Sequence, residues 1–263
     1  MSLADAFREL HHRDEPLLIA NPWDSGSAKV MESLGFRALA TTSSGAAAAR
    51  GRSDGGLDRD EALQAASDIA AAVGVPVSAD LENGFAEDPS GVADTVRLAV
   101  EAGLAGASVE DWDGTRLYEP ARAADRVRAA VEAADGRLVV TARSENHIHG
   151  IDDLSDTIGR LRSYAAAGAD VVYAPGLRTA DQIKEVVSGV DVPVNVLAMP
   201  GVPSVPELAE LGVRRVSIGG SWAYVAYAAM AEAGREFLVE GTFGFLDAAG
   251  RGQAIVNKAF DAL

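Results

Sequence analysis

The chain contains no cysteine. Among its 263 residues this absence excludes disulfides, zinc sites with thiolate ligands, and a cysteine that acts as nucleophile or acid. Basic residues are also few, with 23 Lys and Arg against 39 Asp and Glu and a formal net charge of -16. Nucleic acids and anionic membranes are bound through clustered Lys and Arg, so we expect neither as a partner.

Long apolar runs are absent too. No run approaches the roughly 20 residues of a transmembrane helix, and the first residues lack the apolar core of a secretory signal. We therefore expect a cytoplasmic location. No Gly-x-Gly-x-x-Gly follows the first expected strand, which removes the main sequence argument for a dinucleotide-binding fold.

Helix-like and strand-like segments alternate along the chain. Short apolar segments predict eight strands, at 17–20, 38–42, 77–80, 107–110, 138–143, 171–174, 194–197 and 215–218. Helical patterns lie before, between and after them, at 3–11, 25–34, 58–73, 89–102, 121–134, 151–167, 179–187, 205–211 and 222–233. This alternation predicts parallel β-α-β units, and eight of them favour an α/β fold closed as a (β/α)₈ TIM barrel.

A weak internal repeat supports the barrel. A glycine ends several helical segments and would supply the left-handed residue that lets the chain turn into the next strand, at Gly35, Gly74, Gly103, Gly168 and Gly212. We assign residues 1–234 to the barrel, as a single catalytic domain. Residues 235–263 form an expected helical extension with C-terminal helices, whose apolar faces would pack on their own or a neighbouring barrel.

Charged residues stand where three expected strands end. Asp80 and Glu82 follow the third strand, Glu110 the fourth and Arg143 the fifth. Parallel strands bring their carboxyl ends to one face of a barrel, where active sites lie. Carboxylates there suit a hard divalent cation, and Arg143 suits an anionic substrate. The structural alternative is an ion pair at the barrel rim, with Arg143 bridging Asp80 or Glu110.

Five segments, in order and at barrel spacing, resemble the isocitrate lyase and phosphoenolpyruvate mutase superfamily. They are Asn-Pro-Trp-Asp at 21–24, Thr-Thr-Ser-Ser-Gly at 41–45 with Asp54 downstream, Asp-Leu-Glu-Asn-Gly at 80–84, Val-Glu-Asp at 109–111 and Arg-Ser-Glu at 143–145. Glu82 stands where the superfamily usually has aspartate. The resemblance implies Mg²⁺, with Mn²⁺ as an alternative, and a 2-oxo acid whose C–C or P–C bond reacts beside the carbonyl through an enolate.

The resemblance also implies roles for these residues. Asp80 would bind the metal directly, while Glu82 and Glu110 would hold its coordinated waters. Arg143 would pair with the substrate carboxylate or enolate oxygen, acting in catalysis together with Glu110 and with Asp54, a further water-holding residue. The substrate-binding residues would be Trp23, Thr42, Ser43, Ser44, Gly45 and Arg143.

Several of these side chains have simpler structural interpretations. Trp23 suits a core position, Thr42 and Ser43 suit a turn, and Asp111 suits a turn cap at Gly114. Two histidines after the fifth strand suit the surface, and a polar residue in the seventh strand suits a hydrogen-bonded core position. These three are His147, His149 and Asn195.

The segment after the fourth strand departs from the resembled superfamily. Residues 112–120 lack the Lys-Lys/Arg-Cys-Gly-His loop of the lyase branch, whose cysteine protonates the enolate. The mutase branch places lysine and asparagine on this loop and a histidine after the sixth strand, where this chain has Tyr-Ala-Pro-Gly at 173–176. Decarboxylation needs mainly an electron sink at the carbonyl, and solvent or Tyr118 could protonate the enolate.

The sequence therefore predicts a Mg²⁺-dependent carbon–carbon lyase for a small 2-oxo acid or its aldol-type adduct, such as an oxaloacetate decarboxylase or a methylisocitrate lyase-like enzyme. Two alternatives remain open. One is a phosphonopyruvate-type mutase or hydrolase, and the other is a binding protein for 2-oxo acids without catalysis. A homo-oligomer, dimer or tetramer, is expected because the C-terminal helices of the resembled superfamily often exchange between barrels.

Overall fold

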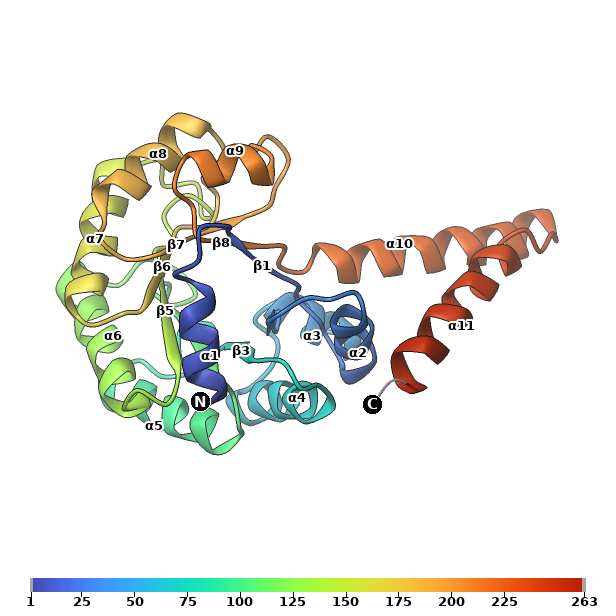
Figure 1. The fold of residues 1–263 in the computed structure, drawn as a ribbon, viewed down its shortest axis with the longest axis horizontal. Helices are drawn as coiled ribbons and strands as arrows, with labels where there is room; N and C mark the ends of the chain where they lie inside the picture. Colours follow the sequence, from blue (N-terminus) through green and yellow to red (C-terminus); the bar gives the residue numbers. More distant parts are fainter. Residues whose placement is uncertain (1, 262–263) are drawn as a thin grey trace.

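The barrel expected from the sequence is confirmed in a computed structural model, which describes residues 2–261 (Figure 1). Eight parallel strands form one sheet in the order β1-β8-β7-β6-β5-β4-β3-β2. They are β1 (Leu17–Ile19), β2 (Leu39–Ala40), β3 (Val77–Asp80), β4 (Gly106–Glu110), β5 (Val139–Arg143), β6 (Val171–Tyr173), β7 (Val194–Leu197) and β8 (Arg215–Ser217).

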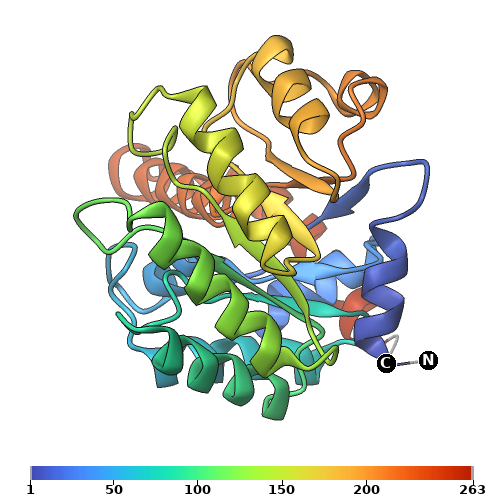
Figure 2. The ribbon, with the colours of Figure 1, turned by 90° about the vertical axis from the view of Figure 1, so that its left-hand side faces the viewer.

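Helices surround this sheet on its outer side (Figure 2). The first seven are α1 (Leu3–Leu10), α2 (Ser25–Ser33), α3 (Ser43–Ala49), α4 (Arg59–Ala72), α5 (Pro89–Glu101), α6 (Pro120–Ala134) and α7 (Leu154–Ala166). The rest are α8 (Ala180–Gly189), α9 (Val205–Glu210), α10 (Ser221–Arg235), the π-helical turn η1 (Glu236–Glu240) and α11 (Leu246–Asp261). None of the helices among residues 2–261 is long and apolar enough to span a membrane.

Helix ends follow local sequence signals. The Asp88 side chain accepts a hydrogen bond from the Gly91 N–H at 2.9 Å and caps α5, whose first residue is proline. Of the five glycines expected to be left-handed after helices, four have positive φ: Gly35, Gly103, Gly168 and Gly212. The prediction is wrong for Gly74, because α4 ends instead at Val73 in an extended conformation.

Helix α3 was not expected from the sequence, which predicts a strand up to residue 42 and a loop beyond it. Strand β2 is shorter and ends at Ala40. Thr42 then caps α3, with its Oγ1 accepting a hydrogen bond from the Gly45 N–H at 3.4 Å. The four alanines at 46–49 are strong helix formers, so the chain turns into a helix directly beside the strand ends.

The seam between β1 and β2 is the least paired part of the barrel. A single bridge, between Ala20 and Leu39, joins the two strands. The Asn21 side chain compensates, since its Nδ2 donates to the Ala40 carbonyl at 3.0 Å. Its Oδ1 accepts from the Gly219 N–H, just after β8, at 3.0 Å. One side chain therefore ties together the ends of β1, β2 and β8.

Helix α1 closes the end of the barrel opposite to these strand ends. Phe7 and Leu10 are buried in a cluster with residues at the starts of β1, β5 and β6 and with residues just before β2 and β4. Gly106, the first residue of β4, permits this closure. A Cβ placed there would lie 2.7 Å from Phe7 Cε1 and 3.0 Å from the Val139 carbonyl oxygen.

We expect Gly106→Ala to lower the free energy of unfolding by about 1–3 kcal/mol, because overpacking at a closed barrel end displaces α1. Urea denaturation would measure this loss. Gly234→Ala, near the C-terminal end of α10, is the matched control, since a Cβ there meets nothing within 4 Å and should be neutral or stabilising. Equal destabilisation in both variants would contradict this interpretation of the packing.

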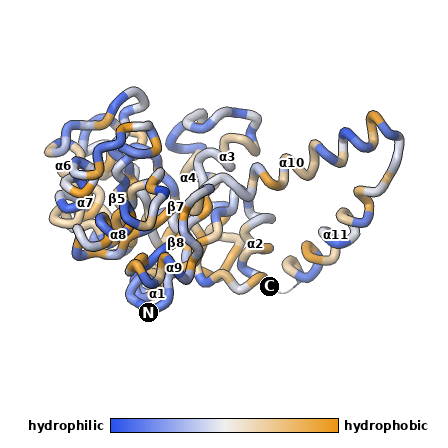
Figure 3. Tube along the Cα trace, turned by 90° about the horizontal axis from the view of Figure 1, so that it is seen from above, coloured by the Kyte–Doolittle hydropathy of each residue, from blue (hydrophilic) through white to orange (hydrophobic). Residues whose placement is uncertain are grey.

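The C-terminal segment leaves the barrel as an arm. Helix α10 extends outward, and α11 runs back to pack on α2 (Figure 1). There the Lys29 Nζ lies 5.6 Å from the centroid of the Phe260 ring. The tip of the arm exposes large apolar side chains: Phe237, Leu238, Val239, Phe243 and Leu246. The tube in Figure 3 has orange, hydrophobic stretches in this part of the chain. Leu238 is 85% exposed, which makes this tip a candidate contact surface.

Candidate active site

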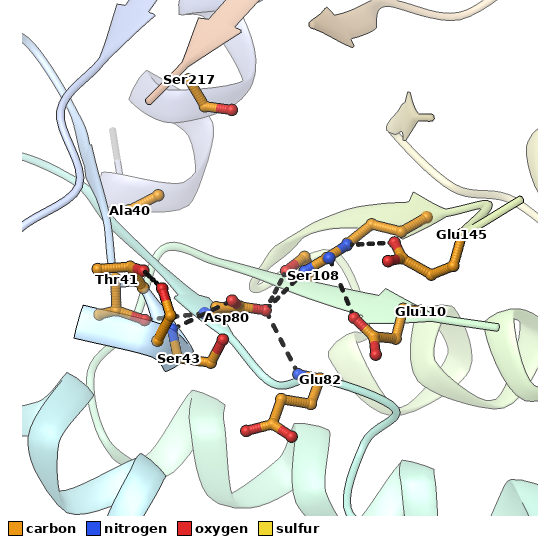
Figure 4. Close-up of polar contacts among 12 residues, drawn as sticks. Ala40, Thr41, Ser43, Asp80, Glu82, Ser108, Glu110, Glu145 and Ser217 are labelled. Carbon is orange, nitrogen blue, oxygen red and sulfur yellow. Dashed lines mark hydrogen bonds and ion pairs between the residues drawn. The ribbon is translucent and has the colours of Figure 1, made fainter. Parts of the chain in front are cut away.

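Three carboxylates share one guanidinium group at the carboxyl ends of the strands (Figure 4). Arg143 Nη1 lies 2.9 Å from Asp80 Oδ1, its Nη2 lies 3.1 Å from Glu110 Oε2, and its Nε lies 2.9 Å from Glu145 Oε1. The Arg143 side chain is 16% exposed. The structure therefore brings together the strand-end residues expected from the sequence, and Arg143 forms both ion pairs named as the structural alternative.

The sheet register explains this convergence. Asp80 of β3 aligns with Ser108 of β4, and Glu110 of β4 aligns with Arg143 of β5. Side chains two residues apart point to the same side of a strand, so Ser108 and Glu110 face the site together. The Ser108 Oγ donates a hydrogen bond to Asp80 Oδ1 at 3.3 Å.

Asp111 fixes part of the site through buried hydrogen bonds. It is buried, and its Oδ1 accepts a hydrogen bond from the Glu145 N–H at 2.8 Å. Its Oδ2 accepts from Arg160 Nη1 at 3.1 Å and from the Tyr164 hydroxyl. The suggested turn cap at Gly114 belongs instead to Asp113, which lies two residues further along the chain and accepts hydrogen bonds from the next turn. Asp111 fixes the backbone that carries Glu145.

Two polar cavities open around these residues. The smaller, of about 210 Å³, lies over the barrel axis, and the larger, of about 410 Å³, lies toward the loops after β3, β4 and β5. Both are lined by the residues where they meet: Ser43, Asp54, Arg143 and Ile148. The site is therefore a divided cleft with the Arg143 cluster at its centre.

Negative charge accumulates in this cleft. Burial raises the pKa of Glu82 to about 7, and the nearby Asp80 and Asp54 add to the effect. Burial likewise raises the pKa of Glu110 well above its usual range and raises that of Glu145, against the opposing influence of Arg143. One guanidinium therefore does not balance the surrounding carboxylates.

The predicted substrate-binding residues of α3 lie at the smaller cavity. Thr42, Ser43 and Ser44 line it, and the Ser43 N–H donates to Asp80 Oδ2 at 3.3 Å. Gly45 is buried behind them, where a Cβ would lie 2.7 Å from Thr42 Cγ2. Trp23 lines neither cavity and packs against the hydrophobic core. The roles in substrate binding remain predictions for all five residues.

Comparisons with known proteins identify the family of the chain. Residues 7–238 match the family model described as phosphoenolpyruvate phosphomutase. The chain belongs to this family. A crystal structure from Burkholderia cenocepacia, provisionally assigned as a lyase or mutase, is 48% identical, with a TM-score of 0.92 and coverage of 96% of this chain and 93% of that chain.

Two further relatives have more specific names. The structure of 2,3-dimethylmalate lyase, a member of the phosphoenolpyruvate mutase and isocitrate lyase superfamily, is 27% identical with a TM-score of 0.84, covering 93% of this chain and 90% of that chain. Oxaloacetate decarboxylase 1 of Pseudomonas fluorescens is 30% identical over 233 residues, or 84% of this chain and 79% of that protein. The superfamily inferred from the five segments is thus confirmed, and the relatives named are lyases, decarboxylases or mutases.

In this member of the phosphoenolpyruvate phosphomutase family, the loop after β4 is short and folds on itself. A bridge joins Trp112 to Leu117, and the Trp112 ring stacks on His149, with 3.6 Å between ring centroids. His149 is exposed at the rim of the larger cavity, as expected for a surface residue. The same expectation is wrong for His147, whose side chain is only 4% exposed.

Tyr118, named from the sequence as a proton donor, lies outside both cavities. Its ring is buried 4.1 Å from the Arg126 guanidinium carbon, within the core cluster beneath α6. The structure does not support the suggested role. Instead, the cleft contains polar residues that sequence reasoning did not select: Ser78, Ser108, Tyr173, Arg215 and Ser217. Two of them, Ser78 and Ser108, precede the selected strand-end residues Asp80 and Glu110 by two positions, and this spacing could have identified them.

The donor set fits a hard cation that takes few protein ligands. Among residues 2–261, no group of three or more His, Asp or Glu side chains is arranged to hold a metal ion. Mg²⁺ often uses only one or two carboxylates and completes its coordination with water and substrate. Glu82 forms no ion pair with another described residue, and Asp80 Oδ2 accepts only the long Ser43 hydrogen bond. These oxygens could hold such an ion directly or through water.

Glu82→Gln is expected to change how stability depends on pH. The pKa of Glu82 is about 7 when folded against 4.5 as its ordinary value, so the folded protein holds a proton that the unfolded chain has lost between these values. Stability of the native protein should therefore fall as pH rises through this window, and the variant should lack this contribution. Urea denaturation at pH 5 and pH 8 would show it, with the exposed Glu101→Gln as control. Identical pH dependence in native protein and Glu82→Gln would refute the expectation.

Proposed function

We propose that this protein is a Mg²⁺-dependent carbon–carbon lyase for small 2-oxo acids, and that oxaloacetate decarboxylation is the reaction to test first. The observation that carries the proposal is the excess of carboxylates over cations in the cleft. Asp80, Glu110 and Glu145 share Arg143 alone, and Glu82 has no cationic partner among the described residues. Dense buried carboxylates are costly without a compensating cation.

The residues of the cleft would have different roles in binding the metal and the substrate. A bound Mg²⁺ or Mn²⁺ would act as a Lewis acid on the carbonyl oxygen. Asp80 would hold it directly, while Glu82 and Glu110 would hold its waters. Asp54, exposed at the meeting point of both cavities, would hold a further water. Arg143 keeps Asp80 and Glu110 in place and supplies the positive charge nearest to an anionic substrate.

The remaining contacts would orient the substrate. The hydroxyl groups of Thr42, Ser43 and Ser44 lie at the wall of the smaller cavity, where they can donate hydrogen bonds to a carboxylate. Both cavities open to solvent at the rim, so water can protonate the enolate that remains after CO₂ is lost. No dedicated acid is therefore required for decarboxylation, which agrees with the absence of cysteine.

Cleavage of an aldol-type adduct is a second candidate. It needs the same cation and the same guanidinium, and the similarity to 2,3-dimethylmalate lyase favours it. The P–C alternative has less support. The sixth strand ends in Tyr173 rather than histidine, and Arg116, the one cation on the loop after β4, is 85% exposed and paired with Asp113.

Turnover measurements test the proposal. Pyruvate formation from oxaloacetate would be followed with Mg²⁺ or Mn²⁺, and the rate compared with that of the metal ion alone. Parallel assays would use 2-methylisocitrate, 2,3-dimethylmalate and, for P–C chemistry, phosphonopyruvate with phosphate detection. Calorimetric binding of oxalate without turnover of any substrate would instead favour the binding-protein alternative.

We also propose that the protein is a homo-oligomer, a dimer or tetramer, in which the apolar tip of the arm is covered by a neighbouring chain. Light scattering should give two or four times the mass of one chain. Leu238→Glu should shift the protein toward monomer, because it places a charge on the most exposed apolar side chain of the tip. Leu3→Glu, on α1, is the control. A monomeric native protein would contradict the proposal.

A further inference from the structure

Arg215 is a buried cation without an anionic partner. It begins β8, is 4% exposed and lies inside the barrel. Its Nε donates to Asn195 Oδ1 at 2.8 Å, and its Nη1 donates to Thr141 Oγ1 at 3.0 Å and lies 3.4 Å from His11 Nε2. Within residues 2–261 it forms no salt bridge. Most buried guanidinium groups are paired with a carboxylate, so this environment requires an explanation.

All three partners of Arg215 are neutral. His11 Nδ1 lies 2.8 Å from the Phe7 carbonyl, so its N–H donates there and leaves Nε2 as an acceptor. Burial also lowers the pKa of His11 to about 3, which keeps the ring uncharged. Asn195 Nδ2 donates to Ser217 Oγ at 3.0 Å, which turns its Oδ1 toward Arg215. This confirms Asn195 as a hydrogen-bonded core residue and leaves the charge of Arg215 uncompensated.

One end of the guanidinium faces open space. No hydrogen bond within the part of the chain that the structure describes uses Arg215 Nη2, and Arg215 lines the smaller cavity. The side chains around this cavity include hydroxyl groups rather than the branched apolar residues that usually fill a barrel interior. They are Ser78, Ser108, Tyr173 and Ser217.

The energetics favour an anion in this space. Burial lowers the pKa of Arg215 to about 10; the nearby Tyr173 hydroxyl opposes this shift, and the positive charge of Arg143 adds to it. An unpaired buried charge is among the costliest features of a folded protein. A small anion beside Nη2 would neutralise the charge, and the hydroxyls of Ser78 and Ser217 could donate to its remaining oxygens.

We propose that the smaller cavity contains an anion subsite, with Arg215 Nη2 and the hydroxyl groups of Ser78 and Ser217 as its donors, for a carboxylate or small oxyanion. The subsite lies deeper in the barrel than Arg143, since Arg215 begins its strand whereas Arg143 ends one. The anion could be free or could be a carboxylate of the substrate. In the second case the inference rests on the proposed function and predicts a preference for dicarboxylates over monocarboxylates.

Anion binding to metal-free protein tests the subsite without any enzymatic assay. In EDTA, acetate at constant ionic strength should raise the midpoint of thermal unfolding of the native protein with a saturable dependence on concentration. Arg215→Met should lose this response. Arg214→Met is the matched control, because Arg214 is the adjacent residue and contacts the backbone near Arg13 outside the cavity. It should keep the full response.

A second variant covers the case in which Arg215→Met does not fold. Asn195→Asp keeps Arg215 and places a carboxylate at the position now 2.8 Å from its Nε. This internal anion should weaken apparent acetate binding by about tenfold or more. A bromide-soaked crystal of the native protein should show anomalous density beside Arg215. An acetate response in Asn195→Asp equal to that of the native protein, or no bromide at Arg215, would overturn the proposal.

Competition distinguishes the two sources of the anion. If the substrate supplies a carboxylate, acetate should raise the KM for oxaloacetate without changing kcat. If the anion is free, KM should not change. Absence of turnover with an intact acetate response would remove the proposed function and leave the subsite standing. Normal turnover with no acetate response in the native protein would remove the subsite and leave the proposed function standing.

Discussion

Asp80→Asn is expected to reduce turnover of oxaloacetate by at least about 10³-fold, since it removes the carboxylate placed to bind the cation that stabilises developing charge. The change keeps the size of the side chain and an oxygen that can accept from Arg143, so folding should be preserved. Steady-state kinetics and calorimetry of oxalate binding with Mg²⁺ would measure the two effects separately.

Asp125→Asn is the control for this substitution, because it makes the same change in charge on the exposed side of α6. It should leave both kinetics and binding unaltered. Unchanged Mg²⁺-dependent oxalate binding by Asp80→Asn would show that the cation is held elsewhere in the cleft.

Arg143→Met should have the largest effect on stability. Removing the guanidinium leaves Asp80, Glu110 and Glu145 unneutralised, and breaking a buried ion pair from one side typically costs about 3–5 kcal/mol. The loss should be greatest at pH 8. Burial already raises the pKa values of Glu110 and Glu145, so these groups would take up protons on acidification while the unfolded chain still held them ionised.

Urea denaturation at pH 8 and pH 5 would therefore show a deficit that shrinks at the lower pH. Arg116→Met is the control, because the 85%-exposed Arg116 forms only a surface pair with Asp113, worth at most about 1 kcal/mol. A variant at Arg143 that is as stable as the native protein at pH 8 would contradict the expected role of this residue.

The strand-end residues could be predicted because parallel strands share one direction. Asp80, Glu110 and Arg143 each follow an apolar strand segment, so the barrel alone brings them to one face. Their detailed pairing could not be predicted. Whether Arg143 contacts one carboxylate or three depends on the register between β3, β4 and β5 and on the turn that returns Glu145 to the site.

Other features depended on contacts that no local pattern reveals. Tyr118 follows the site in sequence, yet its ring turns into the core because Arg126 packs on it. Arg215 stands in a strand beside a second arginine, and only the closed barrel shows that it points inward to Asn195 while Arg214 does not. A side chain's orientation in a barrel follows strand parity, but its partners follow from the closure of the whole sheet.

The weakly paired seam has a consequence for motion. The joint between β1 and β2, held by a single bridge, should open before the rest of the barrel. The amide hydrogen of Ala40, which donates to the Ala20 carbonyl across this joint, should therefore exchange with deuterium sooner than those of β4 or β5. Helix α3 and its hydroxyl groups follow directly after this joint. A transient separation of β1 from β2 would therefore widen the entrance to the smaller cavity. The hydrogen bonds of Asn21 across the joint would then determine how often it opens to admit a small acid.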